Sequence, residues 1–507
     1  IDGEAANNYS GNSVSLSSDG TIVAIGASFN NGNAAGHVRV YQYASGTWTK
    51  LGSDIDGEGG DDQSGYSVSL SSDGTIVAIG APYNDGSGNA AGHVRVYQYA
   101  SGTWTKLGSD IDGEAAGDNS GWSVSMSSDG TIVAIGAIRN NGNGTDAGHV
   151  RVYQYASSTD TWTQLGSDID GEAANNYSGN SVSLSSDGTI VAIGAKTNNG
   201  NGSNSGHVRV YKYVSNWSQV GSDIDGEAVN DNSGKSVSLS DDGTIVAIGD
   251  LYNDGNGNNS GHVRVYKNVS DVWTKICTCG PDGGDIDGEA ANDNSGYSVS
   301  MSSDGTIVAI GAPFNNGNGN NSGHVRVYEA VDLTVTLSVA NTTVAESVGA
   351  VTVTATLNNA AVSCDVTVDL SFGGTATGGG TDYRMSSNSI TISAGSTTGT
   401  TTLTVIDDNI DENDETVIID ISSVTNATES GTQQATVTIT DNDTPTASDV
   451  SATTPEDTSV DITLVGSGAG SLTYSIVSNP TNGTVSLSGS TATYTPNANY
   501  NGSHSFT

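Results

Sequence analysis

Carboxylates are concentrated in two short stretches of the last quarter of the chain. Residues 407–415 read Asp-Asp-Asn-Ile-Asp-Glu-Asn-Asp-Glu, and residues 441–443 read Asp-Asn-Asp. Carboxylates this dense repel one another unless a cation neutralises them, and hard oxygen ligands in this number suit Ca²⁺. We therefore expect calcium as a cofactor at these loops. The alternative interpretation is a solvated acidic loop that orders no metal.

A histidine and an arginine recur, two residues apart, at one position of an internal repeat. The histidines are His37, His93, His149, His207, His262 and His324, and the arginines are Arg39, Arg95, Arg151, Arg209, Arg264 and Arg326. A catalytic site is singular and convergent, so an identical histidine in every copy favours a structural role. We expect each histidine to pack near the Asp-Gly turn of its own repeat, in a hydrogen-bond network. Each arginine should pair with acids of the Ile-Asp-Gly-Glu segments; a ring of arginines that binds an anion is the alternative.

Other residue types that could do chemistry give weaker signals. No Ser-His-Asp or Cys-His set stands apart from the repeat, so we predict that the chain is not an enzyme. Cys277 and Cys279 form a pair that is too small for a zinc site. With Cys364 they make an odd number of cysteines, and an intermolecular disulfide is therefore a hypothesis.

The repeated residues belong to a unit that occurs six times in the first 330 residues. Its opening isoleucine stands at Ile1, Ile55, Ile111, Ile169, Ile224 and Ile286. The first copy has strand signals over 13–16, 21–25, 37–43 and 48–51, and Ser18-Asp19-Gly20 supplies a hairpin turn. This pattern predicts an all-β protein that begins with a β-propeller of four-stranded blades.

The sixth copy departs from the pattern, because no Trp-containing fourth strand follows residue 328. An open ring would leave unpaired sheet edges. We expect either a segment upstream of Ile1 to close the ring or a seventh blade to lie there, and the number of blades stays open between six and seven. We interpret the chain as a piece of a longer secreted protein.

The Asn/Gly-rich loops before each repeated histidine, such as residues 253–260, should project from one rim of the propeller. Asn-Gly pairs are first of all turn formers. As a set, the loops would also present a ring of amides that could engage carbohydrate or a protein neighbour.

Residues 295–328 carry Gly-Tyr-Ser-Val, Gly-Ala-Pro and Gly-His-Val-Arg-Val-Tyr in this order. In these landmarks the unit resembles the FG-GAP repeat of integrin-type propellers, over about two-thirds of the chain. That family often has an acidic calcium loop between its first two strands. Each copy here has only Ser-Ser-Asp-Gly or Ser-Asp-Asp-Gly, which cannot supply six or more oxygens, so we expect no calcium in the propeller.

Residues 331–443 alternate Val and Thr over six or seven stretches, which predicts a β-sandwich. Gly374-Thr375-Ala376, Thr381-Asp382-Tyr383 and the two acidic stretches make this segment resemble a Calx-β domain. The resemblance implies calcium ligands at one pole of the sandwich: Glu346, Asp382, Asp407, Asp408, Glu412, Glu415, Asp441 and Asp443. Asn442 stands where the family can have another acid. The pole adjoins the next domain, so calcium would also stiffen that junction.

Residues 444–507 resemble cadherin-like or bacterial Ig-like repeats, on Pro-Glu-Asp-Thr at 455–458, Leu-Thr-Tyr at 472–474 and the stretch 494–507. The domain looks incomplete. The expected domains are therefore 1–330, 331–443 and 444–507.

The chain has 56 acidic and 15 basic side chains, a formal charge of −41. This balance opposes nucleic acid and anionic membranes as partners, and no apolar run is long enough for direct membrane insertion. We predict an extracellular, cell-surface adhesion or structural protein whose partners are other surface proteins or glycans. The alternatives are a polymerising subunit of a filament, appendage or sheath, and, more weakly, a propeller-based glycan hydrolase or lyase. N-glycosylation sequons are about as frequent as composition gives by chance, so they allow a glycoprotein without indicating one.

Overall fold

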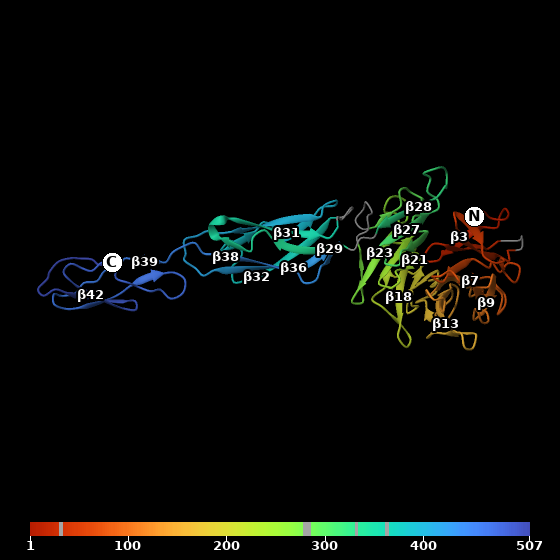
Figure 1. Ribbon diagram of the computed structural model, residues 1–507, viewed down its shortest axis with the longest axis horizontal. Helices are drawn as coiled ribbons and strands as arrows, with labels where there is room; N and C mark the ends of the chain where they lie inside the picture. Colours follow the sequence, from red (N-terminus) through yellow and green to blue (C-terminus); the bar gives the residue numbers. More distant parts are fainter. Residues whose placement is uncertain (30–33, 277–284, 330–332, 360–364) are drawn as a thin grey trace. The chain divides into compact units, whose positions relative to one another are not determined.

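The computed structural model describes residues 1–29, 34–276, 285–329, 333–359 and 365–507 (Figure 1). The described chain forms two compact units, one that runs to Glu329 and one that begins at Leu333. Both units are built from β-strands, as predicted, and a short 3-10 turn, η2 (Glu346–Val348), lies in the second. None of the helical segments in the described ranges is long and apolar enough to cross a membrane. The three cysteines lie outside these ranges, so their pairing stays a hypothesis.

The first unit contains six blades, each made from consecutive strands. The strands of blade 1 are β1 (Ser10–Leu16), β2 (Ile22–Ala27), β3 (His37–Ala44), β4 (Thr47–Lys50) and β5 (Ile55–Asp56). Those of blade 2 are β6 (Ser67–Leu70), β7 (Ile76–Ala81), β8 (His93–Ala100), β9 (Thr103–Lys106) and β10 (Ile111–Asp112). Those of blade 3 are β11 (Ser120–Met126), β12 (Ile132–Ala137), β13 (His149–Ala156), β14 (Thr161–Gln164) and β15 (Ile169–Asp170).

The last three blades repeat this order. The strands of blade 4 are β16 (Ser181–Leu184), β17 (Ile190–Ala195), β18 (His207–Tyr213), β19 (Trp217–Gln219) and β20 (Ile224–Asp225). Those of blade 5 are β21 (Ser233–Leu239), β22 (Ile245–Asp250), β23 (His262–Val269), β24 (Val272–Lys275) and β25 (Ile286–Asp287). Blade 6 has β26 (Ser298–Met301), β27 (Ile307–Ala312) and β28 (His324–Glu329). Among the described residues it is three-stranded, in agreement with the missing Trp-containing strand.

The first hairpin of each blade is closed by side chains of its turn. In blade 1, Asp19 Oδ1 accepts hydrogen bonds from Ser17 Oγ at 2.7 Å and from the N–H of Thr21 at 2.9 Å. Gly20 has a φ of 69°, which residues with a Cβ rarely adopt. The Ser-x-Asp-Gly-Thr spacing therefore fixes the turn, and the apolar strand β2 that follows is almost fully buried.

A short fifth strand extends the predicted four-stranded blade. Ile55 and Asp56 of β5 pair with Val38 and His37 at one end of β3, while β4 pairs with the other end. The Ile-Asp that opens each following repeat thus completes the blade before it. Two residues are too few to show the alternation by which a strand is recognised in a sequence.

Apolar clusters fill the space between consecutive blades. Between blades 1 and 2, Val38 and Val40 of β3 pack with Leu70 of β6. The same repeat positions form the clusters between the later pairs of blades. Trp104, which packs against this cluster, donates from Nε1 to the carbonyl oxygen of Leu51, at 2.9 Å. An apolar cluster therefore joins each pair of consecutive blades, and an indole hydrogen bond is added in blades 2 to 5.

The two terminal blades keep one apolar face uncovered. Val14 and Leu16 of β1 are 62% and 58% exposed, whereas Leu70, at the position of Leu16 in blade 2, is 7% exposed. Val325 and Val327 of β28 are 69% and 65% exposed. Ring closure and the choice between six and seven blades stay predictions.

The second unit begins with a sandwich of two five-stranded sheets, as predicted. One sheet has the order β33-β35-β31-β29-β37 and the other β30-β38-β36-β32-β34. The strands of the first sheet are β29 (Thr334–Val339), β31 (Ala350–Leu357), β33 (Tyr383–Met385), β35 (Thr398–Val405) and β37 (Thr428–Glu429). Those of the second are β30 (Thr343–Ala345), β32 (Val366–Gly374), β34 (Ser389–Ile392), β36 (Glu415–Thr425) and β38 (Gln434–Thr440). Their alternating Val, Ile and Leu side chains form the buried core.

Two small sheets complete the second unit. β39 (Thr446–Ser448) pairs with β41 (Val465–Ser467), and β43 (Thr491–Pro496) lies between β40 (Val460–Thr463) and β42 (Gly483–Ser488). The domain boundaries at 330 and 443 stay predictions.

Candidate metal centre

Strand pairing in the sandwich brings the predicted calcium ligands toward one pole. β30 pairs with β38 in parallel, with Ala345 opposite Thr440, so the next residues, Glu346 and Asp441, are neighbours. Glu415, the first residue of β36, pairs with Ile439 of β38. The remaining predicted ligands precede β33 or follow β35 and β38: Asp382, Asp407, Asp408, Glu412 and Asp443.

Hydrogen bonds tie the acidic loops to one another. Asp441 Oδ2 accepts from the N–H of Glu412 at 3.2 Å, and its Oδ1 accepts from the N–H of Asp443 at 3.1 Å. Asn442 donates from Nδ2 to Asp407 Oδ1 at 3.3 Å. The loop after β35 is therefore held against the segment after β38 by both backbone and side-chain contacts.

Glu346 is the most buried of these carboxylates, with a side chain that is 7% exposed. Its Oε2 atom is buried without a hydrogen bond. Burial, followed by the negative charges of Asp441 and Asp408, raises the pKa of Glu346 to about 7. A carboxyl group in this environment gains from any cation that approaches it.

The neighbouring carboxylates share this field. Burial, with a hydrogen bond to Asp382 and the negative charge of that residue, raises the pKa of Glu415 to about 7. The pKa values of Glu412 and Asp443 are also raised, by burial and by the surrounding carboxylates. The donor set consists of carboxylate oxygens, which are the ligands that calcium prefers.

The structure thus brings the predicted acidic residues to one pole, and their binding of calcium stays a prediction. One contact of the same loop was not predicted. Asp411 Oδ2 accepts from the N–H of Ala469 at 2.6 Å, so this carboxylate holds the segment between β41 and β42. Among the six acids of 407–415 the sequence offers no signal that separates this role from the role of a metal ligand.

The predicted place of the repeated histidines is wrong. The aspartate of each Asp-Gly turn is bonded within its own turn, as for Asp19, and the histidine lies elsewhere. β2 runs from Ile22, opposite Gln42, to Ala27, opposite His37, so about 17 Å of strand separates the turn from the histidine. The histidines instead lie beside acids that flank their blades; His93 Nδ1, for example, is 3.9 Å from Asp110 Oδ2.

The charge of the histidine differs between blades. Burial lowers the pKa of His149 to about 4. In blade 5, Asp250 replaces the alanine of the other blades and its Oδ2 lies 2.8 Å from His262 Nε2. Burial lowers the pKa of His262 too, but the charge and hydrogen bond of Asp250 outweigh it and raise this pKa to about 10.

The predicted pairing of the repeated arginines is confirmed. In every blade Nη1 lies 3.2–3.8 Å from the glutamate of the preceding Ile-Asp-Gly-Glu segment. Nη2 donates to the backbone oxygen of the aspartate in that segment, as Arg95 does to Asp56 at 2.8 Å. The arginines therefore anchor the start of each repeat, which does not favour the alternative of an anion-binding ring.

Several amides of the Asn/Gly loops bind the following repeat. Asn143, Asn201 and Asn256 each donate from Nδ2 to the backbone oxygen of a glycine in the next Ile-Asp-Gly-Glu segment, at 2.9 Å. These side chains join neighbouring blades. Recognition of carbohydrate or protein by the loops stays a prediction.

Family models match three parts of the chain. The FG-GAP repeat matches residues 110–153 and 287–328, the Calx-beta domain matches residues 330–443, and the bacterial Ig domain matches residues 442–507. No curated protein sequence matches the chain.

Similar solved structures include a protein from Bacteroides uniformis ATCC 8492 that carries the name 6-phosphogluconolactonase. It is 12% identical over 63% of this chain and 80% of its own, with a TM-score of 0.43. The apo form of the Calx CBD1 domain is 23% identical over 22% of this chain and 100% of its own, with a TM-score of 0.20. The CBD12 calcium-binding domain of CALX1.1 is 24% identical over 21% and 44%, with a TM-score of 0.19. From its N-terminal end onward, the chain therefore carries FG-GAP repeats, a Calx-beta domain and a bacterial Ig domain, in that order.

Proposed function

We propose that this chain acts in an extracellular, non-enzymatic adhesion or structural protein in which calcium stiffens the sandwich. FG-GAP repeats, Calx-beta domains and bacterial Ig domains are typical of surface and binding proteins. The blades would supply the face that binds other surface proteins or glycans. The calcium role is supported most directly by the environment of Glu346. Its buried Oε2 lacks a hydrogen bond, and the negative charges of Asp441 and Asp408 act on it.

Calcium would stiffen the unit because its ligands come from separate segments. Calcium takes about six to eight oxygen ligands, and the acids here come from η2, from the loop after β35, from the start of β36 and from the end of β38. A bound cation would replace the repulsion between these segments with a shared attraction. Asp411, in the same loop, already contacts Ala469, so order in the loop would extend to the following segment.

Thermal unfolding of the full chain, with millimolar calcium and with chelator, tests this proposal. Calcium at one hundred times its Kd should add about 2.7 kcal/mol to the free energy of unfolding. Glu346→Gln should reduce this gain. Asp420→Asn is the matched control, because Asp420 lies about 17 Å along β36 from the pole and accepts from Gln434 at 2.8 Å. A wild-type melting temperature that does not change with calcium would contradict the proposal.

A second candidate function, a subunit that associates with copies of itself, is favoured by the uncovered end faces. Val325 and Val327 stand at the positions of Val38 and Val40, which pack on the next blade inside the array. Leu16 stands at the position of Leu70, which is the partner surface in that contact. Blade 6 of one copy could therefore pack on blade 1 of another by the contact already used between blades, and head-to-tail contacts of this kind build rings or filaments.

Molar mass by light scattering, across a range of protein concentrations, tests the self-association. The molar mass of the wild type should increase with protein concentration. The double variant, Val325→Asp with Val327→Asp, should stay monomeric. Val214→Asp, at a valine that is 78% exposed between β18 and β19, is the control and should behave as the wild type does. A wild-type monomer at every concentration would rule out this second function.

A further inference from the structure

Blades 1 to 5 each place the repeated histidine beside a glutamate and an aspartate. In five blades one histidine nitrogen and one oxygen of each carboxylate lie within 4.8 Å of one another. The groups are Glu4–His37–Asp54, Glu58–His93–Asp110, Glu114–His149–Asp168, Glu172–His207–Asp223 and Glu227–His262–Asp285. The glutamate comes from the segment before the blade and the aspartate from the segment after its fourth strand, so the fold assembles the group from three places in the sequence.

The last residue of the fourth strand divides these blades into two classes. Lys50, Lys106 and Lys275 end this strand in blades 1, 2 and 5, and each Nζ lies 2.6–2.8 Å from the aspartate of its group. Gln164 and Gln219 hold the position in blades 3 and 4 and donate from Nε2 to the aspartate at 2.6 Å. An ammonium neutralises the group in the first class, whereas a neutral amide leaves its negative charge in the second.

In blade 3, the histidine nitrogen faces three carboxylates without bonding to any of them. His149 is 1% exposed, and both of its ring nitrogens are buried without a hydrogen bond. Its Nδ1 lies 4.0 Å from Glu114 Oε2, 3.9 Å from Asp168 Oδ2 and 4.0 Å from Asp170 Oδ1. With Arg151 as the paired guanidinium, the three carboxylates leave two negative charges uncompensated.

Blade 4 repeats this arrangement. His207 is also 1% exposed, and its Nδ1 is buried without a hydrogen bond. That atom lies 3.7 Å from Glu172 Oε2 and 3.5 Å from Asp223 Oδ2. Across the described residues, the histidines with an unbonded buried Nδ1 are those of the two blades that carry glutamine in place of lysine.

The second oxygen of each carboxylate, the one that does not face the histidine, is bound by a neighbouring side chain. In blade 3, Arg151 Nη1 lies 3.3 Å from Glu114 Oε1, and Gln164 donates to Asp168 Oδ1. In blade 4 the same atoms of Glu172 and Asp223 are held in the same way, by Arg209 at 3.6 Å and by Gln219. The other oxygens thereby face the imidazole, which is how outer hydrogen bonds orient the ligands of metal sites. Glu114 Oε2 also accepts from Asn140 Nδ2 at 3.4 Å. Glu172 Oε2 also accepts from Asn198 Nδ2 at 3.2 Å.

We propose that blades 3 and 4 each bind a divalent first-row transition-metal ion, with zinc as the representative, through Glu114–His149–Asp168 and Glu172–His207–Asp223. Imidazole nitrogen selects such ions over calcium, whose ligands are oxygens. Zinc bonds of about 2.0–2.2 Å in a tetrahedral site put ligand atoms roughly 3.4 Å apart. In blade 4 the distances from the histidine Nδ1 to the two carboxylate oxygens are close to this value. In blade 3 the same distances would have to shorten by about half an ångström.

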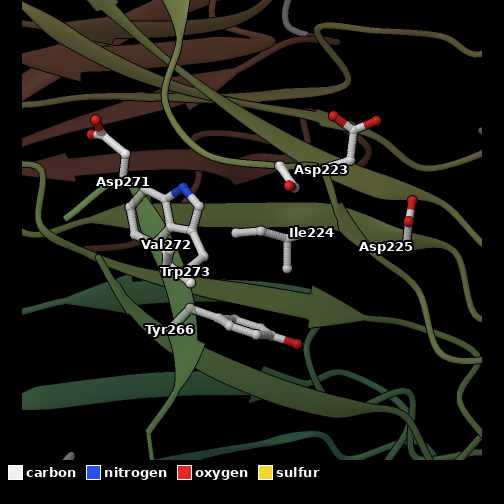
Figure 2. Close-up of a pocket in the computed structure, with 8 residues that line it drawn as sticks. Asp223, Ile224, Asp225, Tyr266, Asp271, Val272 and Trp273 are labelled. Atoms are coloured by element: carbon white, nitrogen blue, oxygen red, sulfur yellow. The ribbon is translucent and has the colours of Figure 1, made fainter. Parts of the chain in front are cut away.

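The blade 4 group is open to solvent on the side of Asp223. Asp223 and Asp225 line a cleft of about 270 Å³, together with Tyr266 and Trp273 of blade 5. Figure 2 shows the two aspartates on one side of Ile224, with Trp273 on the other. A hydrated ion can therefore reach the carboxylates first, while the buried histidine supplies the ligand that selects the ion.

Zinc titration of the full chain by calorimetry, in millimolar calcium that occupies the oxygen-rich pole, tests the proposal. The wild type should bind two zinc ions per chain. The double change Gln164→Lys with Gln219→Lys leaves every ligand in place and copies the lysine of blades 1 and 2, so it should weaken zinc binding at least tenfold. Lys106→Gln should create a third site in blade 2.

Cobalt provides an independent readout, because the visible absorption of bound Co²⁺ depends on its coordination number and on its ligands. The double variant should lose the absorption, and His149→Gln should remove half of it. Equal zinc affinity in the wild type and the double variant would overturn the proposal. A wild type that binds no zinc, or a Lys106→Gln chain that gains none, would overturn it as well.

Discussion

At the Glu346 carboxylate, burial and neighbouring charge act in the same direction, and both favour the protonated form. The pKa of this group is raised from 4.5 to about 7. The folded chain therefore holds this proton to a higher pH than the unfolded chain does. Between these two values the folded state binds more protons, so without metal its stability falls as the pH rises.

This sign gives a prediction for the metal-free chain. From pH 5 to pH 8, the wild type should lose about 1–3 kcal/mol of unfolding free energy relative to Glu346→Gln, which cannot ionise. Chemical denaturation of both chains in chelator, at several pH values, measures the difference. Calcium should abolish the difference between the two pH profiles, and parallel profiles in chelator would contradict the raised pKa.

The role of a single residue was predictable where the residue belongs to a sequence motif. It was not predictable where the role depends only on contacts made in the folded chain. The dense acidic pattern of 407–415 and 441–443 predicted a cation site, and the resemblance to a Calx-β domain placed these carboxylates at one pole. The difference between Lys106 and Gln164 could not be interpreted in advance. Its meaning depends on an aspartate and a histidine that only the folded blade places beside that position.

At the scale of the strand, one indole hydrogen bond links each of blades 2 to 5 to the blade before it. The Nε1 atoms of Trp104, Trp162, Trp217 and Trp273 donate to a backbone oxygen of the preceding blade at 2.7–2.9 Å. Trp48 of blade 1 has no such bond in the described part of the chain, although its ring also packs on a tyrosine, Tyr43.

This contrast supplies a matched pair of variants. Trp162→Phe removes the donor to Leu107 O and should lower the free energy of unfolding by about 1 kcal/mol. Trp48→Phe removes the same atoms without breaking a bond between blades and should cost less. Urea denaturation followed by circular dichroism compares the two, and equal losses would show that the indole bond does not stabilise the contact between blades.

Most strands were predictable because their signals recur six times. Alternation marks β3, an apolar run marks β2, and the Asp-Gly pair marks the turn between the first two strands. The fifth strand and the place of the histidine were not predictable in the same way. Both depend on the pairing of Ile55 and Asp56 with the far end of β3, and a two-residue strand has no period of its own.

At the scale of the whole molecule, the order of the domains was predictable from the sequence. The exposure of the apolar faces on the first and last blades was not. FG-GAP repeats, a Calx-beta domain and a bacterial Ig domain succeed one another as expected. Val14 and Val68 stand at the same position of the repeat, yet one is 62% and the other 8% exposed. Only the packing of neighbouring blades distinguishes them, and this difference supports the proposed contact between copies.

Calcium titration by calorimetry, at pH 7 in two buffers of different ionisation enthalpy, tests the central claim most directly. Calcium should bind, and because the pKa values of Glu346 and Glu415 are about 7, binding should release protons and give different heats in the two buffers. Equal heats would place calcium away from these two carboxylates. A chain of residues 1–507 that binds no calcium at all would contradict the proposed function.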